Sequence, residues 1–318
     1  MSANLEVVNG AARMFYAKDA GVPWHKDGTA VDTAVGYREA LALAGMDWEV
    51  ELRKVRLVDG AQIPTHRATV RTEDNRPLGI VGPDYKIIQN AAAAEWLDSL
   101  YADGKLLFDT AGSIDSGGTL TLWMLARLTE DMRVGDDVFA RYLLATWRHN
   151  GSMSLQIYAT AVRVVCENTW NAAIGGKMLA AVRHTGNIVA KLDAARAILQ
   201  ITDAQHDRML EWLKQANEVK VSEADVVSVQ ETLFGTLDDA TPTQRRNAID
   251  AFMGIYREEA DRTGETAYAL ANTVMGYGDY KVRVTKNNSR MGTILFGQAN
   301  AFKKQGLTAV TKLVAAKS

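Results

Sequence analysis

The chain has 318 residues, of which 47 % are hydrophobic and 23 % charged, and its formal net charge is −2. This composition excludes wholesale disorder, and the length predicts one large domain or two of ordinary size. No segment approaches the roughly 18 consecutive apolar residues of a membrane span, and the first residues lack a secretory signal pattern. We therefore expect a soluble, cytoplasmic protein with no membrane partner.

The first hundred residues predict two helices and a hairpin. The segments with helical spacing are 33–44 and 90–101. Apolar and polar residues partly alternate over 47–58, which predicts a strand, and residues 62–71 are predicted to form its partner strand. Asp-Gly at 59–60 is a hairpin signal, so the two strands are predicted to form a β-hairpin.

Residues 119–162 contain the clearest sheet pattern in the chain. Strands are predicted over 119–128, 138–147 and 152–162, with a turn at His149-Asn150-Gly151. Strict alternation in the last strand predicts an antiparallel sheet with one apolar and one polar face. The glycine-rich stretch at 112–118 lacks the Gly-Lys-Ser/Thr ending of a phosphate-binding loop, and we expect it to turn one strand into the next.

After residue 187 the apolar spacing becomes helical. Ser222-Glu223-Ala224-Asp225 and Thr241-Pro242-Thr243-Gln244 are predicted capping boxes, and they begin helices over about 222–235 and 242–262. The sequence thus predicts an α+β fold, in which an antiparallel sheet-rich N-terminal core is followed by a mostly helical C-terminal part. We divide it into a core (1–186), a helical region (187–275) and a basic segment (276–318).

Charge is unevenly distributed along the chain. Six basic residues lie between positions 141 and 191 against the single acid Glu167, and residues 276–318 have eight basic residues against Asp279. The intervening residues 201–275 are acidic. Two basic stretches in a nearly neutral chain predict a polyanion-binding surface.

Catalytic and metal-binding patterns are weak. Cys166 is the single cysteine, and together with His149 or His184 and Asn168 it provides the residue types of a nucleophilic site. A small sulfur after Val164-Val165 also suits a structural role, which we favour, and the Cys/His enzyme stays an alternative. Neither a metal site nor a cofactor is predicted.

Basic and aromatic residues alternate around the predicted polar face. Such interleaving suits single-stranded nucleic acid, because cations contact phosphates and rings stack on bases. The candidate DNA-binding residues of this stretch are Arg141, Trp147, Arg148, His149, Tyr158, Arg163, Lys177, Arg183 and Lys191. Those near the C-terminus are Lys281, Arg283, Lys286 and Arg290.

Further expectations concern this C-terminal stretch. The spacing Lys281-Val282-Arg283-Val284 predicts a strand with both charges on one side. The apolar spacing from Ile294 to Phe302 predicts a docked helix whose Lys303 and Lys304 face outward.

Several motifs in order carry a family resemblance. They are Val22-Pro23-Trp24-His25, Leu78-Gly79-Ile80-Val81-Gly82 with Tyr85 and Gln89-Asn90, Arg163-Val164-Val165-Cys166-Glu167-Asn168-Thr169, and Arg183-His184-Thr185-Gly186-Asn187. Together they resemble the phage- and plasmid-encoded family called domain of unknown function nine-thirty-two. The resemblance implies a mobile-element origin and a bacterial host, and because the family has no established activity, no catalytic residue can be transferred from it.

The order of elements is also similar, at the level of architecture, to Rad fifty-two-like single-strand annealing proteins. Our leading hypothesis is a single-stranded DNA-binding and annealing protein, not an enzyme, that acts in recombination without ATP as a homo-oligomeric ring or filament. Exposed sheet edges motivate the oligomer. The alternatives are an interaction protein that binds or inhibits a host factor through the acidic helices, and the Cys/His enzyme.

Overall fold

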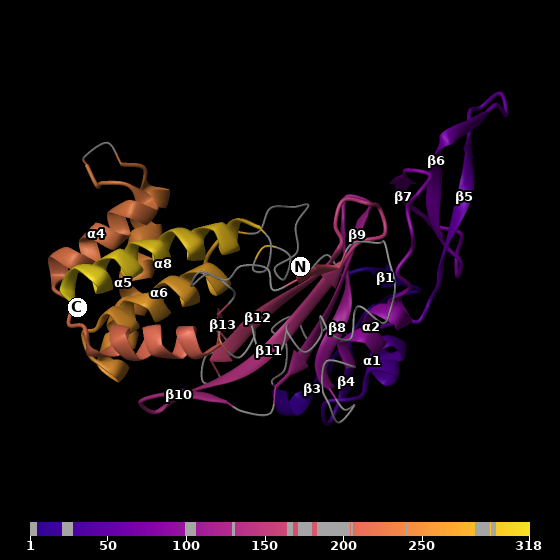
Figure 1. Cartoon of the computed structure of the whole chain (residues 1–318). Coiled ribbons are helices and arrows are strands. Elements are labelled where there is room, and N and C mark those ends of the chain that lie inside the picture. The colour runs from indigo at the N-terminus through magenta and orange to yellow at the C-terminus, as the bar shows by residue number, and fades with distance from the viewer. Residues whose placement is uncertain are drawn as a thin grey trace.

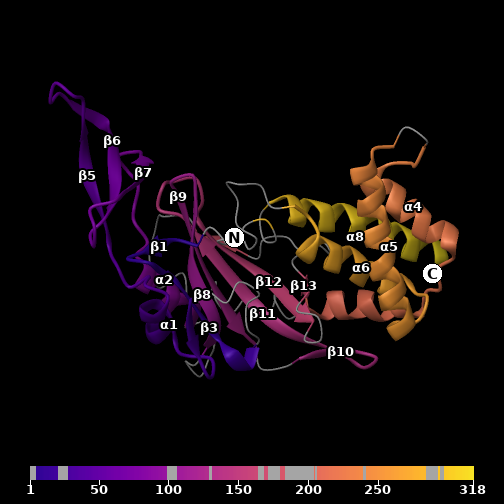
Figure 2. The same cartoon turned by 180° about the vertical axis from the view of Figure 1, so that it is seen from behind.

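Strands dominate the first half of the protein and helices the second, so the predicted α+β class is confirmed (Figures 1 and 2). The computed structural model describes residues 5–20, 28–98, 106–128, 131–163, 168–170, 180–182, 204, 206–238, 241–283, 293 and 297–318.

One large sheet forms the centre of the molecule. Its strands follow the order β13-β12-β11-β9-β8-β3-β4, with β10 beside β11 and β14 beside β12, and every pair is antiparallel except β3 with β4. The bounds are β3 (Met14–Ala17), β4 (Thr29–Val31), β8 (Leu107–Ser116), β9 (Thr119–Arg127), β10 (Met132–Val134), β11 (Asp137–Trp147), β12 (Leu155–Arg163), β13 (Asn168–Trp170) and β14 (Ala180–Val182).

The glycine-rich stretch extends a strand further than predicted. The turn consists of Gly117 and Gly118, both at positive φ, whereas Gly112 lies inside β8. A Cβ at Gly112 would lie 2.9 Å from the carbonyl oxygen of Arg13, so glycine allows the close approach of the chain just before β3.

A second, three-stranded sheet extends away from the body at the end opposite the C-terminal helices (Figure 1). It contains β5 (Val50–Arg56), β6 (Gln62–Arg71) and β7 (Pro77–Val81), so the hairpin predicted at Asp59-Gly60 is confirmed. The short ribbon of β1 (Val7–Val8) and β2 (Ala11–Ala12) precedes β3.

The central sheet is buried on both faces, whereas the sequence predicted one polar face. Leu122, Leu143 and Ala145 pack against α1 (Tyr37–Leu43) and α2 (Asn90–Asp98), and we call this side the α1/α2 face. On the opposite face, Trp123 and Thr146 are nevertheless at most 1 % exposed. The polar residues of this face are therefore mainly packed against other residues.

The C-terminal helices form a second apolar core, which they share with Phe139 and Ala161 of the central sheet. They are α4 (Glu223–Phe234), α5 (Thr243–Thr263), α6 (Ala267–Tyr280) and α8 (Gln298–Lys317); residues 206–218 are also helical. Leu270, Val274, Leu307 and Val310 lie together in this core. The boundary that we expected at residue 275 falls inside α6, and α8 shares the core of α4–α6. None of the helices in the described ranges is long and apolar enough to cross a membrane.

One predicted capping box is confirmed and the other is wrong. The Ser222 hydroxyl accepts from the Asp225 backbone N–H, and the Asp225 carboxylate accepts from the Ser222 N–H at 2.7 Å. At α5 the N-cap is Pro242, which has no capping side chain, and the Thr241 hydroxyl donates instead to Asp238.

The start of α4 provides a pH-dependent contribution to stability. Hydrogen bonds from Lys317 and Ser222 lower the pKa of Asp225 from 3.8 to about 2. Because the folded pKa is depressed, this contribution is present above pH 4 and is lost as the pH falls towards 2. We expect Asp225→Asn to lower stability at pH 7 and to flatten the pH dependence between pH 4 and 2, as measured by urea unfolding. A variant that keeps the full acid dependence would contradict this assignment.

Candidate nucleic-acid interface

The predicted site residues on the central hairpin lie on two different faces of the sheet. Successive side chains of a strand point to opposite faces, so Arg141 and Trp147 share the α1/α2 face with Leu143, opposite Arg148 and Tyr158. Arg163, at the end of β12, pairs with Phe139 of β11, which is two residues before Arg141. The backbone register therefore places Arg163 at a position of the same face as Arg141. The sequence predicted that these residues share one polar surface, and this prediction is wrong. Arg148 and Tyr158 lie on one face of the sheet, and Arg141 and Trp147 lie on the other.

Trp147 is a core residue and not a base-stacking residue. Its side chain is 1 % exposed, and its indole Nε1–H donates to the Asn90 Oδ1 at 3.1 Å. The sequence pattern already placed Trp147 in alternation with Leu143 and Ala145, which was the available signal for its burial.

His149 is also buried, at 3 % exposure. Its Nε2 lies 2.9 Å from the same Asn90 Oδ1, and the Asn90 amide nitrogen donates to the carbonyls of Met46 and Trp48. Since the Asn90 oxygen is an acceptor, the Nε2 of His149 bears the hydrogen. This buried ring therefore lies against Asn90 at the turn after β11 and is not exposed for a contact with DNA.

Arg148 lies partly exposed on the opposite face of the sheet. Its Nε donates to the Thr121 hydroxyl at 2.9 Å, and partial burial lowers its pKa. Arg148 forms no ion pair with any carboxylate in the described ranges. Its guanidinium is thus positioned by neutral partners and keeps an uncompensated positive charge.

Tyr158 lies on the same face as Arg148, four residues further along in register. Its hydroxyl donates to Gln156 at 2.8 Å, its ring is half-buried, and burial raises its pKa. At about 3.3 Å per residue, Arg148 and Tyr158 are separated by roughly 13 Å along the sheet.

The C-terminal basic stretch reaches this same face. Val282 packs against the apolar cluster of Trp123 and Leu144, on which Tyr158 also packs. Lys281 and Arg283 flank Val282 and are exposed. We call Arg148, Gln156, Tyr158, Lys281 and Arg283 the sheet-face surface.

Two C-terminal expectations are corrected. Lys281 is the C-cap of α6 and residues 281–283 form a turn, so the strand predicted over 281–284 is not formed in its described part. Lys303 faces inward, because its side chain is 0 % exposed and its Nζ lies 2.6 Å from the Asp279 Oδ1. Lys304 is exposed, as predicted.

The other predicted residues fall outside the described ranges. These are Lys177, Arg183, Lys191, Lys286 and Arg290, together with Cys166 and His184 of the alternative enzyme. Within the described ranges no group of three or more His, Cys, Asp or Glu side chains is arranged to hold a metal ion.

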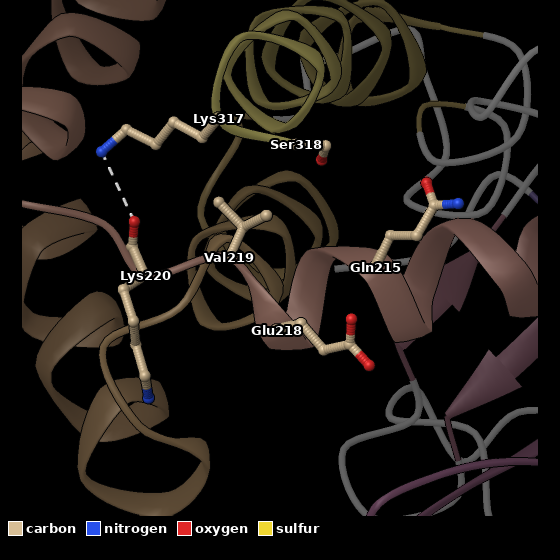
Figure 3. Close-up of a pocket in the computed structure, with 6 residues that line it drawn as sticks. All are labelled: Gln215, Glu218, Val219, Lys220, Lys317 and Ser318. Atoms are coloured by element: carbon tan, nitrogen blue, oxygen red, sulfur yellow. Dashed lines mark hydrogen bonds between the residues drawn. The ribbon is translucent and has the colours of Figure 1, made fainter.

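An open pocket of about 720 Å³ lies far from the sheet-face surface, at the C-terminal end of α8 (Figure 3). Glu218, Lys220 and Lys317 contribute its charged groups, and the Lys317 ammonium donates to the Lys220 carbonyl. The sequence predicted none of its residues as functional.

These features define an α+β protein with a mainly antiparallel sheet, a terminal helical bundle and a cationic surface that includes a tyrosine. The chain belongs to the family described as domain of unknown function (DUF932), whose family model matches residues 77–295. No curated protein and no solved structure matches the chain.

Proposed function

We propose that this protein binds single-stranded DNA on the sheet-face surface and promotes annealing of complementary strands without ATP. The observation that carries the proposal is the convergence of the two basic stretches: Tyr158 and Val282 pack on one cluster, and Lys281 and Arg283 lie exposed beside it. Phosphates would contact Arg148, Lys281 and Arg283, and the Tyr158 ring would stack on a base.

Self-association belongs to the same proposal. The central sheet ends at β4 and β13, and strands at a sheet edge have backbone groups available for pairing. A homo-oligomer, ring or filament, would align several sheet-face surfaces and hold one strand extended for pairing. A phage or plasmid origin and a bacterial cytoplasm, as the motifs suggested, fit such a role in recombination.

The proposal is tested by fluorescence polarisation with single-stranded oligonucleotides over a salt series. Each lost phosphate contact reduces the slope of log affinity against log salt by about 0.7. We expect Arg148→Gln/Lys281→Gln/Arg283→Gln to flatten the slope by about 2 units. The control Lys214→Gln/Lys304→Gln/Lys312→Gln removes as much charge from exposed helical positions, so it should leave the slope unchanged.

Base stacking is tested separately. Tyr158→Leu keeps an apolar side chain on the cluster and is expected to weaken single-strand binding about 5- to 150-fold, the range measured for stacked aromatics. Trp147→Phe is the matched control and should bind normally, because the ring is buried. Equal slopes in both triple variants, or only monomer in light scattering with and without oligonucleotide, would contradict the proposal.

A further inference from the structure

The β5–β6 hairpin forms an arm that extends beyond the rest of the molecule, and both views show its tip distant from the C-terminal helices (Figures 1 and 2). From Val50 in β5 to Val58 in the turn, the extended chain spans roughly 26 Å. The tip is an ordered turn, because the Gly60 N–H donates to the Leu57 carbonyl and the Ala61 N–H donates to the Asp59 carboxylate at 2.9 Å. We call residues 50–71 the arm.

The base of the arm is attached to the body by buried charged contacts. Arg71 ends β6, is 1 % exposed, and donates to Glu6 at 2.7 Å while its guanidinium lies over the Trp48 ring. The neighbouring β7 packs closely on the turn after β11, since a Cβ at Gly79 would lie 2.4 Å from Cβ of Asn150. These contacts attach the base of the arm firmly to the body of the protein.

The arm is locally cationic in a chain of negative net charge. Residues 52–67 contain four arginines and lysines and one acid, Asp59. Lys54 lies directly opposite Arg67, and like charges at such a pair repel each other. Lys54 and Arg56 are exposed and form no ion pair within the described ranges. An external anion would relieve this repulsion.

The tip of the arm presents two exposed apolar side chains beside the exposed carboxylate of Asp59. Leu57 is 54 % exposed and Val58 fully exposed, at the corner of the turn. Two apolar side chains at the tip of a cationic two-stranded ribbon match the groove of a nucleic-acid duplex. A two-stranded ribbon fits the major groove, and phosphates line the rims of that groove. Apolar side chains contact bases or insert between them. A second copy of this chain fits less well, because charged side chains on the edge strand β5 oppose strand pairing.

We propose that the arm binds duplex nucleic acid, with Lys54 and Arg56 on the phosphates and Leu57 and Val58 against the bases. This inference goes beyond single-strand binding and does not depend on it, since the arm lies outside the sheet-face surface and precedes the residues that match the family. The signal for the arm in the sequence is the local excess of cations over residues 52–67.

The test compares a 20-base-pair duplex, with 2-aminopurine at its centre, and the matching single strand. For Lys54→Gln/Arg56→Gln we expect weaker duplex binding and a salt slope flatter by about 2 units, with single-strand binding unchanged. For Leu57→Ser/Val58→Ser we expect about tenfold weaker duplex binding, an unchanged salt slope, and loss of the protein-induced change in 2-aminopurine fluorescence. The controls are Lys304→Gln/Lys312→Gln for charge and Val227→Ser/Leu237→Ser for exposed apolar residues of the helical part.

Three outcomes would overturn the inference. If the arm variants bind the duplex as tightly as their control variants do, the arm does not contact the duplex. Reduced self-association with normal duplex binding would assign the arm to an interface between copies. Equal weakening of single-strand and duplex binding would make the arm part of a general polyanion surface. The sheet-face variants are tested only for single-strand binding. Failure of the single-strand proposal is therefore distinguishable from failure of the proposal that the arm binds duplex.

Discussion

Replacing Lys303 with alanine is expected to lower the free energy of unfolding by about 3–5 kcal/mol, the cost of leaving a buried charge without its partner. The Lys303 ammonium and the Asp279 carboxylate are 2.6 Å apart between α6 and α8, at 0 % and 3 % exposure. The lysine stem crosses α6 at Gly278, where a Cβ would lie 2.5 Å from the Lys303 Cγ. Removal of Lys303 therefore leaves both a buried carboxylate and a gap.

Urea unfolding of two further variants separates charge from packing. Lys304→Ala changes the exposed neighbour and should alter stability by no more than about 0.5 kcal/mol. The double variant Asp279→Asn/Lys303→Met removes both charges and keeps a long side chain, so it should regain most of the lost stability. Wild-type stability in Lys303→Ala would show that this lysine is not part of the core.

Arg71→Ala is expected to lower the free energy of unfolding by about 1.5–3 kcal/mol, the range for hydrogen bonds to charged groups, because Glu6 keeps its contact with Arg76. The Arg71 guanidinium donates to Glu6 at 2.7 Å and to Asp74 at 2.6 Å, and Glu6 is itself 3 % exposed. The comparison is Arg53→Ala, which breaks an exposed pair with Glu51 on the arm and should cost at most about 1 kcal/mol. Equal effects of the two substitutions in urea unfolding would contradict the assignment.

The same variant changes the acid dependence of stability. The hydrogen bond from Arg71 is the main cause that lowers the pKa of Asp74 from 3.8 to about 2. The wild-type contribution is therefore present above pH 4 and is lost as the pH falls towards 2. In Arg71→Ala this part of the pH profile should be reduced but not lost, because the Arg76 backbone N–H still donates to Asp74 at 3.0 Å. An unchanged profile would contradict the assignment.

Local pattern was sufficient to predict several elements and the fold class. Alternation predicted β12, Asp-Gly predicted the turn of the arm, and Ser222 with Asp225 predicted the start of α4. These features depend on neighbours within a few residues in the chain. The same reasoning missed α6, because Gly276 and Gly278 weaken a helix pattern, and packing of α6 against α5 and α8 stabilises the helix instead.

The candidate site was predicted less well, because its members are selected by partners distant in sequence. The sequence pattern alone established basic stretches, candidate rings and an antiparallel hairpin. Only the tertiary structure decided that Lys303 is buried against Asp279 while Lys304 is exposed, and that Trp147 bonds to Asn90 while Tyr158 keeps part of its ring in solvent. The physical reason is that burial depends on which elements pack together, and packing between residues 24 to 65 positions apart leaves no periodic signal in the chain.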